Sequence, residues 1–365
     1  MIGAARVHLG MWGAGAAAAG RLVGSGFRAY RAGGRAAVGE LLTASAGQRD
    51  VFAVLRAFWP NLRVSRRLIT AYENTGTAVV TRRSDVNEVL EREADFAVVY
   101  EPRMRAITAG ENFFLGMQEG AEYQRDTSLM RLAARRDDVA RIVTPIAQEE
   151  AAAVVAAAPG RIDVPAALSG PVPARIVARY FGLPMQDEAR VVEWATTMFW
   201  YLFADLRADP KVGEAAMTAA AGARAWIDAA VAERKAAPSD VEDVLGRCLT
   251  LQAAGVPGMD DLAIRNNLIG LVIGLIPTLS KAAVLALAQL VDRPEALATA
   301  RNAARAGDDA TLAACVFEAL RFDPVNPIIY RRANRDVEIA RGTRRALRVP
   351  KGTMVLAANL SAMFD

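Results

Sequence analysis

One long apolar segment, residues 261–291, constrains the fold of this chain more than any other feature. Within it, apolar side chains cover every helical face over residues 268–276. A helix that is apolar all round lies either in the core of a large domain or in a membrane. Pro277 lies near its midpoint, where a proline removes one hydrogen bond and clashes with the carbonyl of Ile273, at a cost of about 3 kcal/mol or more. The pattern therefore predicts a buried helix that is kinked at Pro277.

The composition indicates an α-rich globular protein and excludes several kinds of site. Of the 365 residues, 53% are hydrophobic, and the formal net charge of +4 is spread along the chain. Nucleic-acid binding is disfavoured because no dense basic stripe is present. The single histidine, His8, excludes a histidine-based zinc site and argues against a Ser-His-Asp or Cys-His site. Two cysteines, Cys248 and Cys315, make no disulfide framework in so long a chain, which favours a cytoplasmic protein.

The chain divides into an N-terminal leader and one large domain. Residues 1–50 are rich in Ala, Gly and Arg, and we expect a weakly structured leader there. Its apolar run, residues 10–20, is too short to span a bilayer. Residues 51–365 show no internal repeat and no low-complexity linker, so we expect a single domain.

Hydrophobic periodicity and turn residues predict the elements of that domain. Helices are predicted at residues 52–62, 86–92, 120–136, 138–157, 171–181, 187–204, 211–235, 240–254, 261–291, 294–305 and 308–321. Residues 68–72 and 77–81 are predicted to form a hairpin, because Asn and Gly in the intervening residues 73–76 favour a turn. Residues 336–340 and 348–357 contain further β-formers.

A series of short motifs follows the long apolar helix. Glu318 and Arg321 are spaced to share one helix face and to form an ion pair. After them come Arg-Arg-Ala-Asn-Arg-Asp-Val-Glu from Arg331, Val-Pro-Lys-Gly-Thr-Met-Val from Val349 and Ser-Ala-Met-Phe-Asp from Ser361. In this order and at this spacing, the segments resemble the landmarks of the cytochrome P-450 family, the haem-thiolate monooxygenases.

This resemblance implies a mainly α fold with a small β-sheet region and a haem beside the long helix. Arg331 matches the family's propionate-binding arginine. The family's His-x-x-x-Arg at the start of an earlier helix is replaced by Tyr123 and Thr127. A tyrosine hydroxyl can still bond a carboxylate, and Arg125 or Arg131 would have to supply the missing charge. Tyr123, Arg125 and Arg331 are therefore the candidate cofactor-binding residues.

The resemblance covers roughly residues 50–365 and lacks the family's metal ligand. In the family, a cysteine thiolate holds the haem iron from a loop that lies several tens of residues beyond the last motif found here. Neither Cys248 nor Cys315 matches that loop, and we expect both to be small core residues. We therefore expect a chain truncated at its C-terminus, with no metal ligand of its own. The arginine that the family's Glu-x-x-Arg pair meets would also lie downstream, so the Glu318 pair would be under-satisfied if buried.

The long helix departs from the family at the oxygen-activation site. The family pattern is Ala/Gly-Gly-x-acid-Thr-Thr, in which the acid and the alcohol relay protons. Gly274 fits the glycine, but Ile276 replaces the acid and Pro277 replaces the first threonine. Thr278 fits the second threonine, and Ser280 carries another hydroxyl nearby. The candidate catalytic residues are Gly274, Pro277 and Thr278.

Three functions remain open from the sequence. The first is a monooxygenase that takes electrons from a ferredoxin-type or flavoprotein reductase. The second is a peroxide-using or hydroperoxide-rearranging enzyme, which needs no acid–alcohol pair. The third is a non-catalytic, haem-free helical fragment or binding module. A membrane span is disfavoured, because it would place Asn266, Asn267 and Lys281 in the bilayer.

The substrate is expected to be an apolar small molecule. In the family, substrate contacts come from the loop around residues 100–113 and from the helices at 187–204 and 211–235. These segments contain Phe113, Phe114, Met198, Phe199, Trp200 and Phe203.

Overall fold

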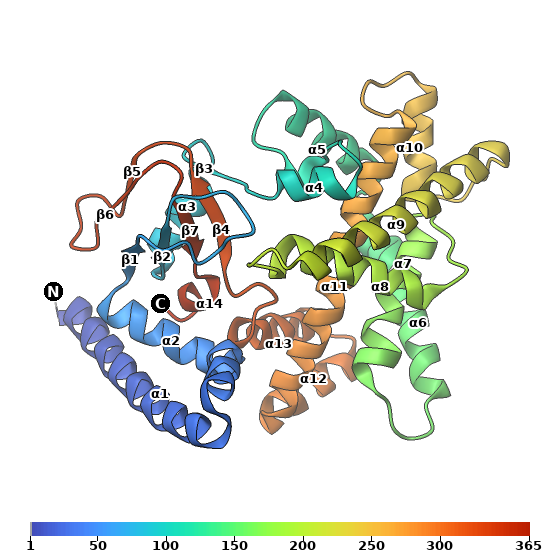
Figure 1. The fold of residues 1–365 in the computed structure, drawn as a ribbon. Helices are drawn as coiled ribbons and strands as arrows, with labels where there is room; N and C mark the ends of the chain where they lie inside the picture. The colour runs from blue at the N-terminus through green and yellow to red at the C-terminus, as the bar shows by residue number, and fades with distance from the viewer. Residues whose placement is uncertain (1) are drawn as a thin grey trace. The chain divides into compact units, whose positions relative to one another are not determined.

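The structure, a computed structural model, describes residues 2–365 and the side chains of residues 10–365; the side chain of His8 lies outside this description. The fold is mainly helical with a small sheet region, as the sequence predicts (Figure 1). Backbone contacts divide it into two compact units. Unit 1 contains the residues up to Ala97 together with Leu285–Asp365, and unit 2 contains Val98–Val284.

Unit 2 is built from helices whose bounds agree closely with the hydrophobic periodicity. They are α4 (Glu101–Ile107), η1 (Phe114–Gly116), α5 (Ala121–Ala133), η2 (Val139–Val143), α6 (Thr144–Ala157), η3 (Val164–Ser169), α7 (Pro171–Tyr180), α8 (Glu188–Phe199), η4 (Trp200–Ala204), α9 (Pro210–Ala236), α10 (Val244–Ala253) and the first part of α11 (Asp261–Val291). Helices α7, α8, α9 and α10 pack around α11, so the core of this unit forms along one central helix.

Helix α11 is the predicted long apolar helix. It continues through Pro277 and has the length and mean hydropathy, 2.0, of a membrane span. In unit 2 it is a core helix, because Leu268, Ile273 and Ile276 are at most 1% exposed. Beyond Pro277 the expectation of full burial is wrong, since Leu279 is 44% exposed.

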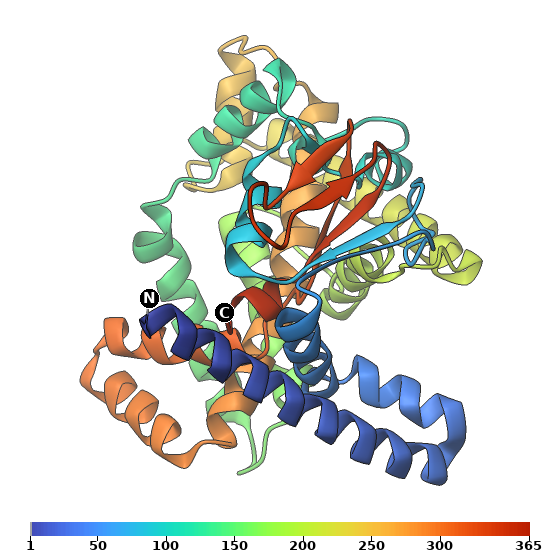
Figure 2. The same ribbon diagram turned by 90° about the vertical axis from the view of Figure 1, so that its left-hand side faces the viewer.

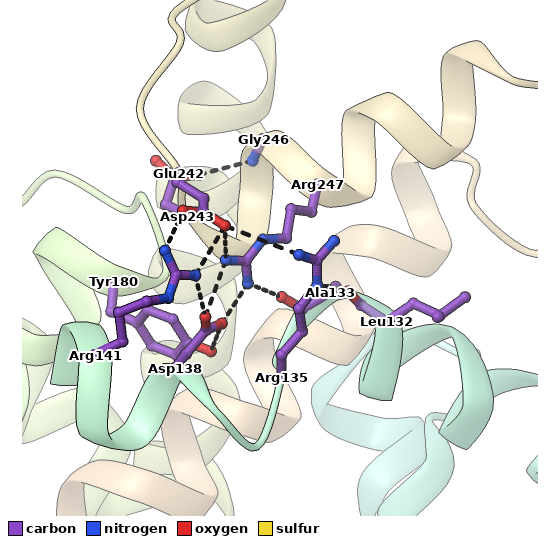
Figure 3. Close-up of polar contacts among 10 residues, drawn as sticks. All are labelled: Leu132, Ala133, Arg135, Asp138, Arg141, Tyr180, Glu242, Asp243, Gly246 and Arg247. Carbon is purple, nitrogen blue, oxygen red and sulfur yellow. Dashed lines mark hydrogen bonds and ion pairs between the residues drawn. The ribbon is translucent and has the colours of Figure 1, made fainter.

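An ion-pair network around the buried Asp138, defined by Asp138, Arg141, Tyr180, Glu242 and Arg247, joins three helical segments of unit 2 (Figure 3). The Asp138 carboxylate is fully buried. It accepts hydrogen bonds from Arg141 Nη2 at 2.8 Å, from the Tyr180 hydroxyl at 2.8 Å and from Arg247 Nη2 at 3.2 Å. Burial alone would raise the pKa of Asp138, but the hydrogen bonds from Arg247, Tyr180 and Arg141 hold that pKa well below its usual value. The network therefore keeps a charged carboxylate in the protein interior.

Unit 1 contains the sheets and the helices that surround them. Its elements are α1 (Ile2–Thr43), α2 (Ser45–Phe58), β1 (Asn61–Val64), β2 (Thr77–Val80), α3 (Arg83–Glu91), β3 (Phe96–Ala97), the end of α11, α12 (Pro294–Ala306), α13 (Asp309–Phe322), β4 (Ile329–Ala333), β5 (Val337–Ile339), β6 (Leu347–Val349), β7 (Met354–Ala357) and α14 (Asn359–Ala362). The larger sheet has the order β1-β2-β7-β4-β3, and β5 pairs with β6. Strand β2 runs parallel to β7, with Thr77 opposite Met354, so the sheet joins distant parts of the sequence.

The predicted hairpin is only half right. Strand β2 agrees with the prediction, but its partner is β1 at residues 61–64 and not residues 68–72. Residues 68–72 instead belong to a connection in which the Asn74 side-chain amide donates hydrogen bonds to the carbonyls of Ile69 and Tyr72. The β-forming side chains of that connection are buried without entering the sheet, since Ile69 and Tyr72 are at most 5% exposed.

Helix α1 forms where a weakly structured leader was expected. It lies beside α2 as an antiparallel partner (Figures 1 and 2, blue). Gly15 permits the close approach, because a Cβ at that position would lie 2.4 Å from the Cβ of Ala57. The helical backbone breaks at Gly33 and Gly34, the second of which has φ 64°. Packing against α2 thus stabilises a helix in which frequent glycines offset the favourable propensity of its alanines.

Candidate active site

The loop before α5 covers the glycine face of α11 within unit 2. Phe113, which is 1% exposed, packs closely against Gly270: a Cβ at Gly270 would lie 2.6 Å from Cδ2 of its ring. Leu115 approaches Gly274, where a Cβ would lie 3.9 Å from Cδ1 of Leu115. The face that contains the predicted Gly274 is therefore lined by an aromatic and an aliphatic side chain.

The hydroxyl groups near Pro277 are engaged by backbone carbonyls. Thr278 Oγ1 donates a hydrogen bond to the Gly274 carbonyl, four residues earlier on the same helix. Ser280 Oγ lies 2.6 Å from the Ile276 carbonyl oxygen and 2.5 Å from that of Ser169. Ile276 is fully buried. The structure thus brings Gly274 and Thr278 together, but it presents no acid and no unengaged hydroxyl proton on this stretch of α11.

Asn267 is a polar group that the sequence reasoning missed. It is 2% exposed, and its Oδ1 atom is buried without a hydrogen-bond partner among the described residues. It lies seven residues before Gly274 and eleven before Thr278, so the three residues share one face of α11. A buried unsatisfied acceptor costs about 1–3 kcal/mol. The signal available in the sequence was an asparagine in an otherwise apolar, buried helix.

The predicted cofactor residues of unit 2 lie on α5. Tyr123 is half-buried. Arg125 Nε donates to Oδ1 of Asp126 at 2.8 Å, and its side chain lies against Gly258, so it is engaged elsewhere. Thr127 Oγ1 is buried and has no hydrogen-bond partner in the described part of the chain. The hydroxyl of Thr127, rather than the charge of Arg125, is the unsatisfied group on this helix.

The predicted cofactor residue of unit 1, Arg331, lies on β4 opposite Val355 of β7. Its side chain is half-buried, and Nη1 donates to the neighbouring carbonyl of Tyr330 at 3.2 Å. Within residues 10–365, Arg331 forms no ion pair with a carboxylate. Its guanidinium therefore keeps donors that suit an acidic ligand group.

The Glu318–Arg321 pair forms as predicted, but it is not buried. Two hydrogen bonds of 2.8 Å join the guanidinium to the carboxylate, and Glu318 remains 57% exposed. Arg321 also donates to the Met363 carbonyl at 2.9 Å and lies over the rings of Phe322 and Phe364. The pair is thus satisfied within unit 1, where it connects α13 to residues 361–365.

The two cysteines differ in exposure. Cys248 is fully buried, and burial, together with the nearby Asp243, raises the pKa of its thiol to about 12. Cys315 is half-buried on α13, one turn before Glu318. Among residues 10–365, no three His, Cys, Asp or Glu side chains are placed to hold a metal ion.

Solved structures of cytochromes P-450 share this fold. Ligand-free cytochrome P-450 TbtJ1 matches with a TM-score of 0.69 and 22% identity over 88% of this chain and 77% of that chain. Open, histidine-tagged cytochrome P-450 EryK from S. erythraea matches with a TM-score of 0.67 and 24% identity over 87% and 74%. P450BioI, in complex with acyl carrier protein ligated to hexadec-9Z-enoic acid, matches with a TM-score of 0.73 and 18% identity over 89% and 79%. No protein-family model and no curated protein matches the chain. At these identities the similarity establishes the fold.

Proposed function

We propose that this chain, which has the cytochrome P-450 fold, is a haem-dependent oxidoreductase of the monooxygenase type that acts on an apolar organic substrate. The observation that carries the proposal is the face of α11 around Gly274. Its two glycines differ, because Gly270 is buried beneath Phe113, whereas Gly274 is half-buried beside Leu115, which is 39% exposed. At Gly274 the helix thus offers a surface without a side chain, against which a flat apolar ligand would lie.

Asn267 would make this apolar face select substrates that carry a hydrogen-bond donor. Its unsatisfied Oδ1 can accept one hydrogen bond from a hydroxyl or amide group of the substrate. Because binding would satisfy a buried acceptor that is otherwise unpaired, a substrate with a donor should be preferred over an analogue without one. Replacing Asn267 with Leu should abolish that preference in a binding titration, whereas an unchanged preference would refute this role.

Arg331 of unit 1 has guanidinium donors without a carboxylate partner in the described residues, and this side chain would hold a haem propionate. Tyr123 and Thr127 of unit 2 carry hydroxyl groups on α5, and that of Thr127 is buried without a partner among the described residues. The roles of these two residues in cofactor binding stay predictions. Neither Cys248 nor Cys315 is proposed as an iron ligand. When bound, the haem would supply the oxidising centre, and a ferredoxin-type or flavoprotein reductase would supply electrons in the monooxygenase reaction.

A peroxide-using reaction is the second candidate, and the geometry of α11 favours it. Dioxygen activation needs protons to be delivered at the helix groove. Ile276 and Pro277 cannot carry a proton, and the hydroxyl of Thr278 donates to the Gly274 carbonyl. A peroxide already contains the reduced oxygen, so this reaction requires neither a proton relay on α11 nor a redox partner.

The test begins with haem binding and then separates the two oxidants. We expect haemin titrated into the full chain to give a saturable absorbance change, and Arg331→Gln to weaken binding about tenfold, because a charge-assisted hydrogen bond is worth about 1.5–3 kcal/mol. Arg332→Gln on the same strand is the matched control and should bind haemin like the parent chain. Equal binding by both variants would contradict the role of Arg331.

Turnover then identifies the oxidant. An apolar substrate oxidised with hydrogen peroxide alone would support the peroxide reaction. Oxidation that requires reduced pyridine nucleotide and a reductase would support the monooxygenase reaction. Failure to bind haemin at all would refute both and leave a non-catalytic binding module.

A further inference from the structure

Helix α1 presents an apolar face that no other described residue covers. Trp12, Val23, Phe27 and Tyr30 are 53%, 74%, 60% and 59% exposed. Their spacings of eleven, four and three residues place all four on one side of the helix. They precede the break at residues 33–34, so the stripe lies on one continuous helical segment.

The opposite face of α1 is already occupied by α2. Ala18 is fully buried, and Gly15 brings the backbone of α1 against Ala57. Arg21 fixes the pair further, because its guanidinium binds the carboxylate of Asp50 with Nη2 2.6 Å from Oδ1. The exposed stripe is therefore a second apolar face, which the packing of α1 against α2 does not use.

The flank of the stripe is basic. Five arginines and no Asp or Glu precede Glu40 in the sequence. The guanidinium carbon of Arg31 lies 4.9 Å from the centroid of the Phe27 ring, and Arg28 Nη2 lies 3.1 Å from Ser25 Oγ. Within residues 10–365, neither Arg28 nor Arg31 forms an ion pair. Arg31 therefore places an unneutralised cation beside the exposed ring of Phe27, whereas Arg28 lies toward Ser25.

Exposed aromatic side chains concentrate in these two helices. Phe58 and Trp59, at the end of α2, are 44% and 57% exposed, and their rings lie 5.9 Å apart. The described chain has seven exposed Phe, Trp and Tyr side chains. Five of them lie on α1 or at the end of α2. Such clustering marks an interaction surface.

We propose that the outward face of α1 binds the surface of an anionic lipid bilayer. An interfacial helix places its aromatic and aliphatic side chains at the boundary between headgroups and acyl chains and its arginines at the lipid phosphates. Trp and Tyr are the side chains that favour this depth. The stripe of Trp12, Val23, Phe27 and Tyr30, with Arg31 on one flank, has this arrangement. The helix lies on the bilayer and does not cross it.

The test is co-sedimentation of the full chain with phosphatidylcholine vesicles that do or do not contain phosphatidylglycerol. The parent chain should bind the anionic vesicles at low salt and be released by high salt. Arg31→Gln should lower the partition coefficient about fivefold, because one arginine near an anionic surface contributes about 1 kcal/mol. Phe27→Ser/Tyr30→Ser should abolish binding. Phe317→Ser, which removes an exposed aromatic ring from α13, is the matched control and should bind like the parent chain.

Fluorescence and oligomeric state complete the test. Vesicle binding should shift the tryptophan emission to the blue, and Trp12→Phe should reduce that shift. The exposed positions of the replaced side chains predict unchanged circular dichroism for every variant. Absence of vesicle binding, or equal binding by the stripe variants and the Phe317 variant, would overturn the proposal. A dimer that Phe27→Ser/Tyr30→Ser dissociates, with no vesicle binding, would overturn it in favour of self-association.

Discussion

Replacing Asp138 with Asn should destabilise unit 2 through the loss of one buried charge. The substitution keeps the shape of the side chain and removes the negative charge that faces Arg247 and Arg141. Arg247 is only 11% exposed, so water cannot replace the missing carboxylate. Removing one partner of a buried ion pair costs about 3–5 kcal/mol. We expect about 3 kcal/mol, the low end, because Glu242 still accepts from Arg247 at 2.9 Å.

A matched control separates burial from charge. Glu149 pairs with Arg179 at 2.9 Å in the same unit, but its side chain is 66% exposed. Glu149→Gln should change stability by less than about 1 kcal/mol, because exposed pairs are screened and hydrated. Equal effects of Asp138→Asn and Glu149→Gln would refute the argument that burial makes the Asp138 charge important.

The assay is urea unfolding followed by tryptophan fluorescence, since three of the five tryptophans, Trp194, Trp200 and Trp226, lie in unit 2. The pH dependence provides a second check. The pKa of Asp138 is lower in the folded chain than in the unfolded chain, so its stabilisation is complete at neutral pH and is lost as the pH falls below about 4. The difference between the parent chain and Asp138→Asn should therefore decrease in acid, and a difference that persists unchanged at pH 3 would contradict the mechanism.

Two further predictions concern the core of unit 2 and the thiols. Gly270→Ala should lower the free energy of unfolding in urea by about 1–3 kcal/mol, because the new Cβ would lie 2.6 Å from the Phe113 ring. Gly274→Ala is the control and should be neutral or stabilising, because its nearest neighbour would lie 3.9 Å away. Equal stabilities of the two variants would contradict this packing. Under native conditions a thiol reagent should modify at most one cysteine, Cys315. Cys248 should not react, because burial raises the pKa of its thiol to about 12. Rapid labelling of the folded Cys315→Ser variant would contradict the burial of Cys248.

The helices could be predicted from sequence because their periodicity is local. Helix α11 has the predicted bounds, and α9 at Pro210–Ala236 differs from the prediction by one residue at each end. Proline and glycine mark most of the boundaries between them. These signals depend on neighbouring residues only, so no knowledge of the tertiary structure is needed to find them.

The sheet and the leader were predicted less well because tertiary contacts decide them. Strand β2 pairs with β7 almost 280 residues away, and no local pattern specifies that partner. Residues 68–72 have strand-forming composition, but the hydrogen bonds of Asn74 hold them in a buried connection. Helix α1 mixes alanines with glycines, and the close contact of Gly15 with α2 is a tertiary feature that the local sequence does not reveal.

The candidate site was predicted in its residue types but not in its hydrogen bonds. The sequence identifies Pro277 and Ile276 as departures from the family pattern, and α11 contains both as one continuous helix. Two features depend on side-chain placement, which the sequence does not specify. The hydroxyl of Thr278 donates to a helix carbonyl, and Asn267 keeps an unsatisfied oxygen. The catalytic roles of Gly274, Pro277 and Thr278 stay predictions.

The Asp138 network also has a kinetic consequence. Its contacts join residues 42 and 109 positions apart in the sequence, so they close only after α7 and α10 have reached their places beside η2. Contacts of such long sequence separation carry a high loop-closure cost and tend to form late in folding. Loss of the Asp138 charge should then speed unfolding far more than it slows folding, which makes this carboxylate a determinant of how long the folded state of unit 2 persists.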